Sequence, residues 1–167
     1  MEVLFQNKHI RDKEWAKDIN RYIYFKRPIL IVVYILCVLY VFSGILMLIF
    51  EQFFDFKLFI FPLLIFAFNL LVYNRNVNLL LKRDLEMCGV TIEVTATVTD
   101  EAIMHVMSSG AQYILNYADI KKVVETKKYI YLWSKTNMLY SFKKDSFSVG
   151  DEEGFKAFLR NKGFKIK

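Results

Sequence analysis

The 167-residue sequence is poor in the side chains from which most enzyme and metal sites are built, since it contains only two histidines and two cysteines. Neither His9 nor His105 has a cysteine, aspartate or glutamate at metal-ligand spacing on a shared element, which argues against a metal site. A phosphate-binding loop, a dinucleotide-binding motif and a nucleophile elbow are also missing. We therefore predict a protein that is not an enzyme and needs no cofactor. A membrane enzyme that uses polar groups without a recognisable motif stays open as an alternative, with Asp100, Glu101 and His105 as the residues to vary.

A disulfide bond is not expected either. Cys37 falls inside a long apolar run, and Cys88 lies on the polar side of a second one. Because a structural disulfide needs both thiols in one oxidising compartment, we predict that both cysteines are free.

Charge is absent from residues 29–50, a run of 22 residues. A helix of this length spans roughly 33 Å at about 1.5 Å per residue, and the hydrocarbon core of a bilayer is about 30 Å thick. The 28 residues before the run are too many and too structured for the first region of a signal peptide. We therefore predict a retained transmembrane helix over residues 29–50.

A second apolar run covers residues 58–73 and lengthens to 55–73 if the charged side chains at its start lie among the lipid headgroups. We expect a second span that forms a hairpin with the first, so that residues 29–73 hold two transmembrane helices. A re-entrant or interfacial helix is the alternative for so short a run. Residues 74–89 continue the helical pattern as a juxtamembrane helix.

Basic residues flank this hairpin on one side of the membrane. Four precede the first span and three follow the second: Lys17, Arg21, Lys26, Arg27, Arg75, Lys82 and Arg83. Lys57 is alone in the connecting loop. By the positive-inside rule we predict a multi-pass membrane protein with both termini in the cytoplasm and the lipid bilayer as its first partner.

Residues 1–28 form the cytoplasmic N-terminal segment. An apolar stripe of Trp15, Ile19, Tyr22 and Ile23 predicts an amphipathic helix, which lies either on the membrane surface or against the soluble domain. The initial EVLFQ has the character of a strand, which would add to the sheet of that domain if it joins it.

From residue 90 the apolar period changes from helical to alternating. The segment TIEVTATVTD predicts a half-buried antiparallel strand, and further short strand patterns bring the total to about six. One of them contains His105, which we expect to be partly exposed. An amphipathic helix that Gly163 terminates follows. The predicted fold is thus an α+β membrane protein, with a two-helix transmembrane hairpin followed by a small antiparallel β-domain, residues 90–167, that has a C-terminal helix.

Four segments of this domain carry a resemblance: TVTDEAI, YADIKKVVETKKYIYLW, SFKKDSF and FKAFLRNK. They resemble the C-terminal domain of the YcxB-like membrane protein family over residues 95–162, and the two preceding spans match the usual layout of that family. The resemblance implies a domain similar to bacterial pleckstrin-homology-like (PH-like) folds, on a small protein of the bacterial cytoplasmic (inner) membrane. Tyr117 stands where a Trp is frequent and Phe142 where a Pro is frequent, so the last strands are expected to differ in detail.

Lysines gather at the ends of the predicted strands and are interleaved with aromatic residues. The candidate binding surface consists of Lys121, Lys122, Lys127, Lys128, Tyr131, Lys143 and Lys144. Such a face suits anionic lipid headgroups or an acidic partner peptide. Ordinary solvation and protection of strand ends is the simpler explanation of the same lysines.

These features predict a small integral membrane protein whose cytoplasmic PH-like β-domain is a non-catalytic binding or regulatory module. Its expected ligand is a protein partner, another copy of the chain, or anionic lipid headgroups. Nucleic acid is not expected, because the net charge of +6 is spread along the chain and forms no dense basic face. The alternative function is an immunity-type protein that protects its host from a membrane-active peptide or toxin, which size and topology alone suggest.

Overall fold

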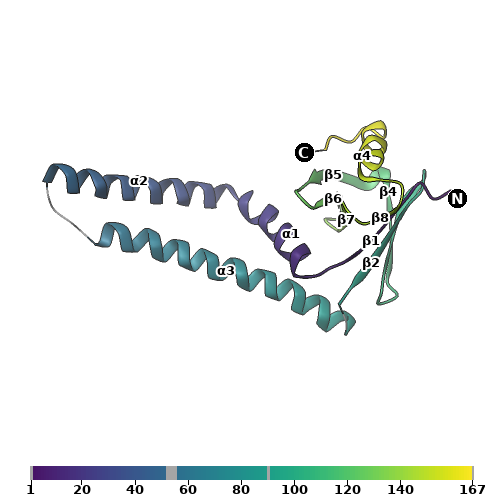
Figure 1. The fold of residues 1–167 in the computed structure, drawn as a ribbon, viewed down its shortest axis with the longest axis horizontal. Coiled ribbons are helices and arrows are strands. Elements are labelled where there is room, and N and C mark those ends of the chain that lie inside the picture. Colours follow the sequence, from purple (N-terminus) through teal and green to yellow (C-terminus); the bar gives the residue numbers. More distant parts are fainter. Residues whose placement is uncertain (1, 52–55, 90, 167) are drawn as a thin grey trace. The chain divides into compact units, whose positions relative to one another are not determined.

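The chain forms two compact units in a computed structural model. The structure describes residues 2–51, 56–89 and 91–166. A β-unit combines residues 1–18 with residues 81–167, and a helical unit consists of residues 19–80. The polypeptide therefore leaves the β-unit after a short N-terminal segment, forms the helical unit, and then returns to complete the β-unit (Figure 1).

Three helices follow one another in the first half of the chain. They are α1 (Lys13–Phe25), α2 (Pro28–Glu51) and α3 (Lys57–Cys88). By length and composition, α2 and α3 are each able to cross a membrane. The second predicted span and the predicted juxtamembrane helix are one continuous helix, α3. The predicted start of that span at residue 55 and the centre of the connecting loop lie outside the described residues, as does the side chain of Cys88, whereas Cys37 is a free thiol.

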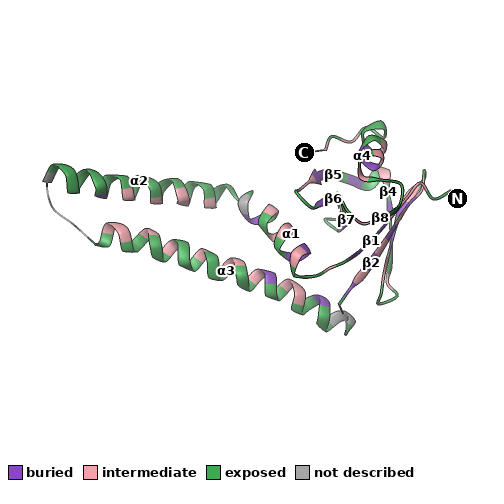
Figure 2. Ribbon diagram, in the orientation of Figure 1, coloured by how far each residue is buried: buried purple, intermediate pink, exposed green. Residues whose placement is uncertain are grey.

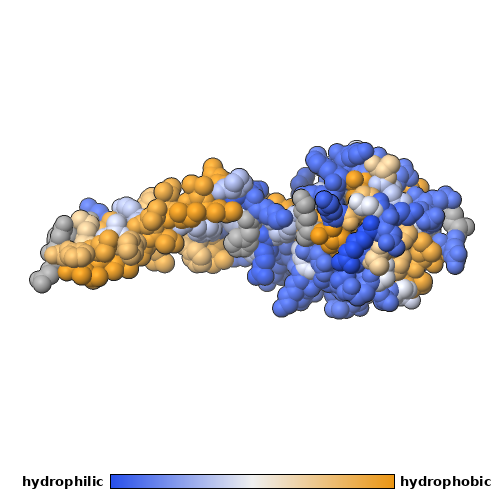
Figure 3. All heavy atoms as spheres, turned by 90° about the horizontal axis from the view of Figure 1, so that it is seen from above, coloured by the Kyte–Doolittle hydropathy of each residue, from blue (hydrophilic) through white to orange (hydrophobic). Residues whose placement is uncertain are grey.

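One face of α2 packs against one face of α3, and the remaining faces of both helices are exposed (Figure 2). The shielded residues recur every three or four positions, as in coiled-coil packing. They include Leu30, Val33, Cys37, Val41 and Gly44 on α2, and Leu58, Pro62, Ile65 and Asn69 on α3. The exposed surface of the two helices is mainly apolar, whereas that of the β-unit is mainly hydrophilic (Figure 3). An apolar exposed surface of this kind suits lipid better than water.

Gly44 marks the closest approach of the two helices. Of the α2 residues whose burial is described, it alone is buried. A Cβ atom added to Gly44 would lie 3.0 Å from the Cβ of Leu58 and 3.4 Å from the Cζ of Phe59. Glycine is therefore the residue that lets α2 approach the first turn of α3, as small residues do at helix contacts in membranes.

A polar contact fixes α1 against α3 within the helical unit. The hydroxyl of Tyr24 donates a hydrogen bond of 2.6 Å to the side-chain oxygen of Asn69. The amide of Asn69 donates in turn to the carbonyl oxygen of Ile65, at 2.8 Å. Asn69, which is unusual in so apolar a helix, thus serves as a helix–helix hydrogen-bond partner.

The β-unit contains two antiparallel sheets. The larger has the order β4 (Gln112–Asn116), β3 (Ala102–Met107), β2 (Glu93–Val98), β1 (Phe5–Ile10) and β8 (Phe147–Val149). The smaller has the order β5 (Ile120–Glu125), β6 (Tyr129–Ser134) and β7 (Leu139–Lys143). The helix α4 (Glu152–Asn161) follows β8. This confirms the α+β class, with two long apolar helices followed by antiparallel strands and a C-terminal helix.

The N-terminal strand is part of the larger sheet. In the antiparallel pairing of β1 with β2, Phe5 lies opposite Val98 and Ile10 lies opposite Glu93. The strand begins at Phe5 and so lies further along the chain than the predicted EVLFQ. The difference arises because the buried positions of β1 are Asn7 and His9, two polar residues that give no apolar alternation. The short strand β8 was not predicted.

The apolar core lies between the two sheets and α4. Its members are Ala96, Val98, Ile103 and Leu115 from the larger sheet, Ile120, Val123, Ile130, Leu132, Tyr140 and Phe142 from the smaller, and Phe155 and Leu159 from α4. The carboxylate of Asp151 caps α4 by accepting a hydrogen bond of 2.7 Å from the amide of Gly154. Gly163 then adopts a positive φ of 90°, which ends the helix as predicted.

We predict that Gly44→Leu destabilises the helical unit, because the new side chain meets Leu58 at the point of closest approach. Overpacking of this kind costs about 1–3 kcal/mol. Thermal unfolding of the detergent-solubilised chain, followed by helical circular dichroism, measures the effect as a melting temperature several degrees lower. The matched control is Ser43→Leu, because Ser43 is exposed on the same helix. Equal melting temperatures for the two variants would contradict the predicted helix contact.

Candidate functional site

Two of the predicted surface lysines are paired with the start of α1. Lys128 forms an ion pair with Glu14, and the Nζ atom of Lys143 lies 3.5 Å from the same carboxylate. The hydrogen bond from Lys128 is the main cause that lowers the pKa of Glu14. These lysines therefore hold α1 against the ends of β6 and β7, and the carboxylate of Glu14 offsets one of their two positive charges.

A third lysine belongs to a cluster that joins β5 to α4. The Nζ atom of Lys144 lies 2.5 Å from Glu125 and 3.2 Å from Glu152. Lys156 of α4 lies 3.4 Å from Glu125 and 2.9 Å from Glu152. Because the four side chains alternate in sign, Lys144 contributes no free positive charge to a binding face.

The remaining members of the predicted surface differ from these lysines in their surroundings. Tyr131 requires a correction, because it is fully buried and its hydroxyl donates a hydrogen bond of 3.0 Å to Asp18. The cause is that both faces of β6 are covered, so that the residue pattern of the strand does not distinguish inside from outside. The amino group of Lys122 lies 4.3 Å from the ring centre of Trp133. Lys121 and Lys127 are exposed.

A buried polar network links β1 to β7, and the sequence alone did not indicate it. The side-chain amide of Asn7 donates a hydrogen bond of 2.7 Å to the carbonyl oxygen of Lys143. The Oδ1 atom of Asn7 accepts one of 3.1 Å from the backbone N–H of Lys143. The side-chain amide of Asn7 thus makes the two hydrogen bonds to Lys143 of β7 that a peptide group of a neighbouring strand would make. The only sequence signal for this network is the polar alternation of Asn7 and His9 within a strand.

His9 completes this network. Its Nδ1 atom lies 3.1 Å from Oδ1 of Asn7, and its Nε2 atom lies 2.9 Å from the hydroxyl of Ser141. Because an amide oxygen only accepts hydrogen bonds, Nδ1 carries the proton and Nε2 accepts from Ser141. Burial, followed by the charges of Arg11 and Lys143, lowers the pKa of His9 from 6.5 to about 4. His9 is therefore a neutral structural group at physiological pH.

The end of the β-unit away from α4 contains a cavity of about 520 Å³. It lies beside the end of β1, the start of β2 and the turn that connects β3 to β4. The helix α4 packs at the other end of these strands, around Phe5. Apolar side chains from several elements form its walls, among them Ile92, Met107, Met138 and Leu139. Arg11, Asp84, His105, Tyr113 and Tyr140 supply polar atoms.

An ion pair forms one wall of this cavity. The Nη2 atom of Arg11 lies 3.1 Å from Oδ2 of Asp84, and both side chains are largely shielded from water. The guanidinium of Arg11 also lies over the ring of Trp15, 4.0 Å from its centre. Burial raises the pKa of Asp84, and the charge of Arg11 opposes this rise. The pair therefore joins the segment after β1 to the end of α3 within the β-unit.

His105 lies in the opposite wall, and the prediction that it is partly exposed is wrong. It is buried because β3 alternates inward and outward positions, with Ile103 and His105 inside and Met104 outside. Its ring contacts Tyr140 and Phe142 edge-on, at centroid distances of 4.9 and 5.3 Å. Its Nε2 atom has no hydrogen-bond partner among the described residues. Burial lowers the pKa of His105 to about 3, so the ring is neutral.

The structure does not bring the three residues of the enzyme alternative together. Asp100 lies at the turn between β2 and β3, and its carboxylate forms an ion pair of 2.7 Å with Lys162. Glu101 is exposed at the same turn, whereas His105 points into the cavity. Within the described ranges, no three histidine, cysteine, aspartate or glutamate side chains gather as metal ligands.

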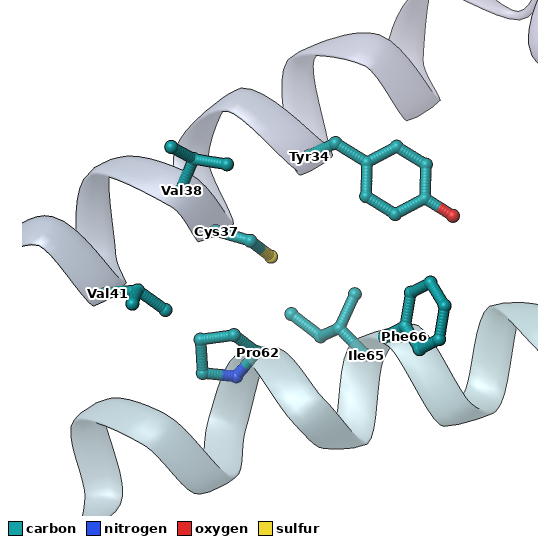
Figure 4. Close-up of a pocket in the computed structure, with 7 residues that line it drawn as sticks. All are labelled: Tyr34, Cys37, Val38, Val41, Pro62, Ile65 and Phe66. Atoms are coloured by element: carbon teal, nitrogen blue, oxygen red, sulfur yellow. The ribbon is translucent and has the colours of Figure 1, made fainter.

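A further cavity, of about 280 Å³, lies between α2 and α3 (Figure 4). Its walls are apolar apart from the thiol of Cys37 and the hydroxyl of Tyr34, which Figure 4 shows on α2 facing Ile65 and Phe66 on α3. This chemistry offers a ligand no charge and little hydrogen bonding. The cavity in the β-unit is therefore the stronger candidate for a binding site.

Comparison with known proteins agrees with the resemblance noted in the sequence. Residues 98–159 match the model of the family described as YcxB-like protein. The matched segment begins at the last residue of β2 and ends within α4, so it includes the whole of the smaller sheet. It also includes β3, β4 and β7, which contribute residues to the walls of the candidate cavity. No curated protein and no solved structure matches the chain.

We predict that the stability of the β-unit decreases from about pH 7 to about pH 5, by about 2 kcal/mol for each buried histidine. The unfolded chain binds protons near the ordinary histidine pKa of 6.5, whereas folded His9 and His105 remain neutral to about pH 4 and about pH 3. Stability is therefore complete above pH 6.5 and is lost as the pH falls below it. Urea unfolding of the solubilised chain, followed by tryptophan fluorescence, measures this loss.

His9→Gln and His105→Phe each remove one titrating group and serve as matched variants for this measurement. Each should lower the pH dependence by about half, because each histidine contributes a similar share. A wild-type stability that is unchanged across this range would show that the folded histidines accept protons freely.

We also predict that Arg11→Met destabilises the β-unit by about 3 kcal/mol, because it leaves the Asp84 carboxylate shielded from water and without its counter-charge. The double variant Arg11→Met/Asp84→Leu should recover most of the loss, since it removes both charges together. The same urea unfolding experiment completes this double-mutant cycle. A double variant as unstable as the sum of the single variants would argue against the pairing.

Proposed function

On the premise that residues 98–159 form a YcxB-like domain, we propose that this chain is a small two-span membrane protein of the bacterial cytoplasmic membrane. It holds a PH-like β-domain on the cytoplasmic side as a non-catalytic binding module. A two-sheet unit closed at one end by a C-terminal helix agrees with the fold that the family resemblance implies.

The pairing of β1 with β2 is the observation that carries this proposal. β1 precedes both apolar helices and β2 follows them, yet the two strands share six pairs of residues in one sheet. Strands of one sheet lie on the same side of a membrane, so the chain between them crosses the bilayer an even number of times. Two spans, α2 and α3, satisfy this condition.

The exposure of the helices supports insertion into lipid. No residue of the most apolar stretch of α3 is buried, and Gly44 alone is buried in the described part of α2. The apolar helix of a soluble core would instead be covered by other elements. A cleaved signal sequence is also disfavoured, because cleavage after α2 would remove β1 from the sheet.

The cytoplasmic side follows from the charges that flank the spans. Seven basic residues precede α2 or follow the apolar part of α3 along the chain: Lys17, Arg21, Lys26, Arg27, Arg75, Lys82 and Arg83. The positive-inside rule assigns such ends to the cytoplasm.

Binding is favoured over catalysis because both histidines and several of the carboxylates are already engaged. Both histidines are buried and neutral, and Glu14, Glu125 and Glu152 are held in ion pairs. General acid–base catalysis needs a group that exchanges a proton near neutral pH. Because carboxylates neutralise part of the positive charge of Lys128, Lys143 and Lys144, we favour a ligand other than anionic headgroups.

Single cysteines in a background of Cys37→Ser and Cys88→Ser test the topology. We expect Lys13→Cys and Lys127→Cys to react with a membrane-impermeant maleimide only after the cells are permeabilised, because both residues are exposed on the β-unit. Lys57→Cys, at the start of α3, should react in intact cells. Labelling of Lys13→Cys and Lys127→Cys from opposite sides would refute the proposed topology.

A further inference from the structure

We propose that the cavity between Arg11, His105 and Tyr140 is the ligand site of the β-unit, and that it binds an uncharged small molecule with an apolar body and one polar group. The polar group forms a hydrogen bond with Nε2 of His105. This inference deepens the proposed function, since it gives the binding module a site and a class of ligand, and it does not depend on the membrane topology.

His105 is the first reason for this assignment. Its side chain is only 3% exposed, it faces the cavity, and its Nε2 atom lacks a hydrogen-bond partner among the described residues. A buried polar atom without a partner is costly and rare in folded proteins. The edge-on contacts with Tyr140 and Phe142 hold the imidazole in one orientation.

The walls of the cavity define the rest of the ligand. A volume of about 520 Å³ lies in the range of small-molecule sites, and such sites are frequent at the mouths of β-barrels and similar sheets. Met107 and Met138 line it together with the aromatic ring of Tyr113. Methionine side chains adapt to ligands of different shapes and contact aromatic groups favourably. A compact apolar or aromatic body is therefore the best complement.

The charges of the site argue for an uncharged ligand. The two ionised groups of the wall, Arg11 and Asp84, neutralise each other at 3.1 Å. An anionic ligand would have to compete with Asp84 for the guanidinium, and a cationic ligand would have to compete with Arg11 for the carboxylate. His105 adds no charge, since its burial keeps it neutral.

Methionine methyl NMR of the full chain in lipid nanodiscs tests the proposal, with phenol, indole and benzoate as probes. Phenol and indole have an apolar body and one hydrogen-bonding group, and benzoate is the charged analogue of similar size. We expect phenol and indole to shift the methyl signals of Met107 and Met138 in a saturable way. Met104 lies on the opposite face of β3, and Met47 lies on α2, so their signals report non-specific contact and partition into lipid.

Two variants separate the hydrogen bond from the cavity. His105→Leu should weaken phenol binding about three- to tenfold, as expected for the loss of one hydrogen bond. Ala111→Phe should abolish it, because Ala111 is a small residue of the wall and the new ring fills the space. Unchanged amide spectra of the remaining β-unit show that each variant is folded.

Several results would overturn the proposal. They are the absence of a saturable shift with either neutral probe, equal shifts at Met104 and Met107, benzoate affinity equal to that of phenol, and unchanged affinity in His105→Leu. A His105→Leu chain that is more stable than the wild type, with no probe bound to either, would mean that only a water molecule occupies the site. None of these results bears on the cysteine labelling, so the proposed ligand site and the proposed membrane topology can each be refuted without the other.

Discussion

The antiparallel pairing of β1 with β2 is the contact on which the rest of the molecule depends. It joins a strand that precedes the helical unit to a strand that follows it, with Phe5 opposite Val98 and Ile10 opposite Glu93. β1 then provides the edge for β8 and contributes Phe5, whose ring packs edge-on against Phe155 of α4 at 5.6 Å. Without β1 the larger sheet would lose its link to β8 and part of the surface on which α4 packs.

The two ends of the β-unit differ in chemistry, and β1 connects them. At one end α4 closes an apolar core with Phe155 and Leu159. At the other end the interior becomes polar, first with the network of Asn7 and His9 and then with the cavity beside His105. A buried polar network is stable only when its members are satisfied. Both ring nitrogens of His9 are bonded, whereas Nε2 of His105 has no partner in the part of the chain that the structure describes.

The elements that could be predicted from the sequence are those that the pattern of apolar and polar residues within a short segment determines. The uncharged run of α2 can be recognised without tertiary information, and so can the alternation of β2 and the termination of α4 at Gly163. The remainder depends on residues distant in the sequence. Lysines at the strand ends pair with carboxylates of α1 and α4, and the hydroxyl of the buried Tyr131 bonds Asp18, more than 100 positions earlier.

The candidate site was hidden for the same reason. A histidine between Met104 and Val106 is compatible with either face of a strand, and only the registration of β3 with β2 places it inside. Likewise Arg11 and Asp84 have no sequence relationship, and they meet because β1 ends where α3 ends. The order of the strands has one further consequence, for biosynthesis. Because β2 emerges from the ribosome about 80 positions after β1, at about 5–20 residues per second, β1 waits roughly 4–16 s for its partner. During that interval α2 and α3 are synthesised, so the larger sheet is completed only after both long apolar helices have been made.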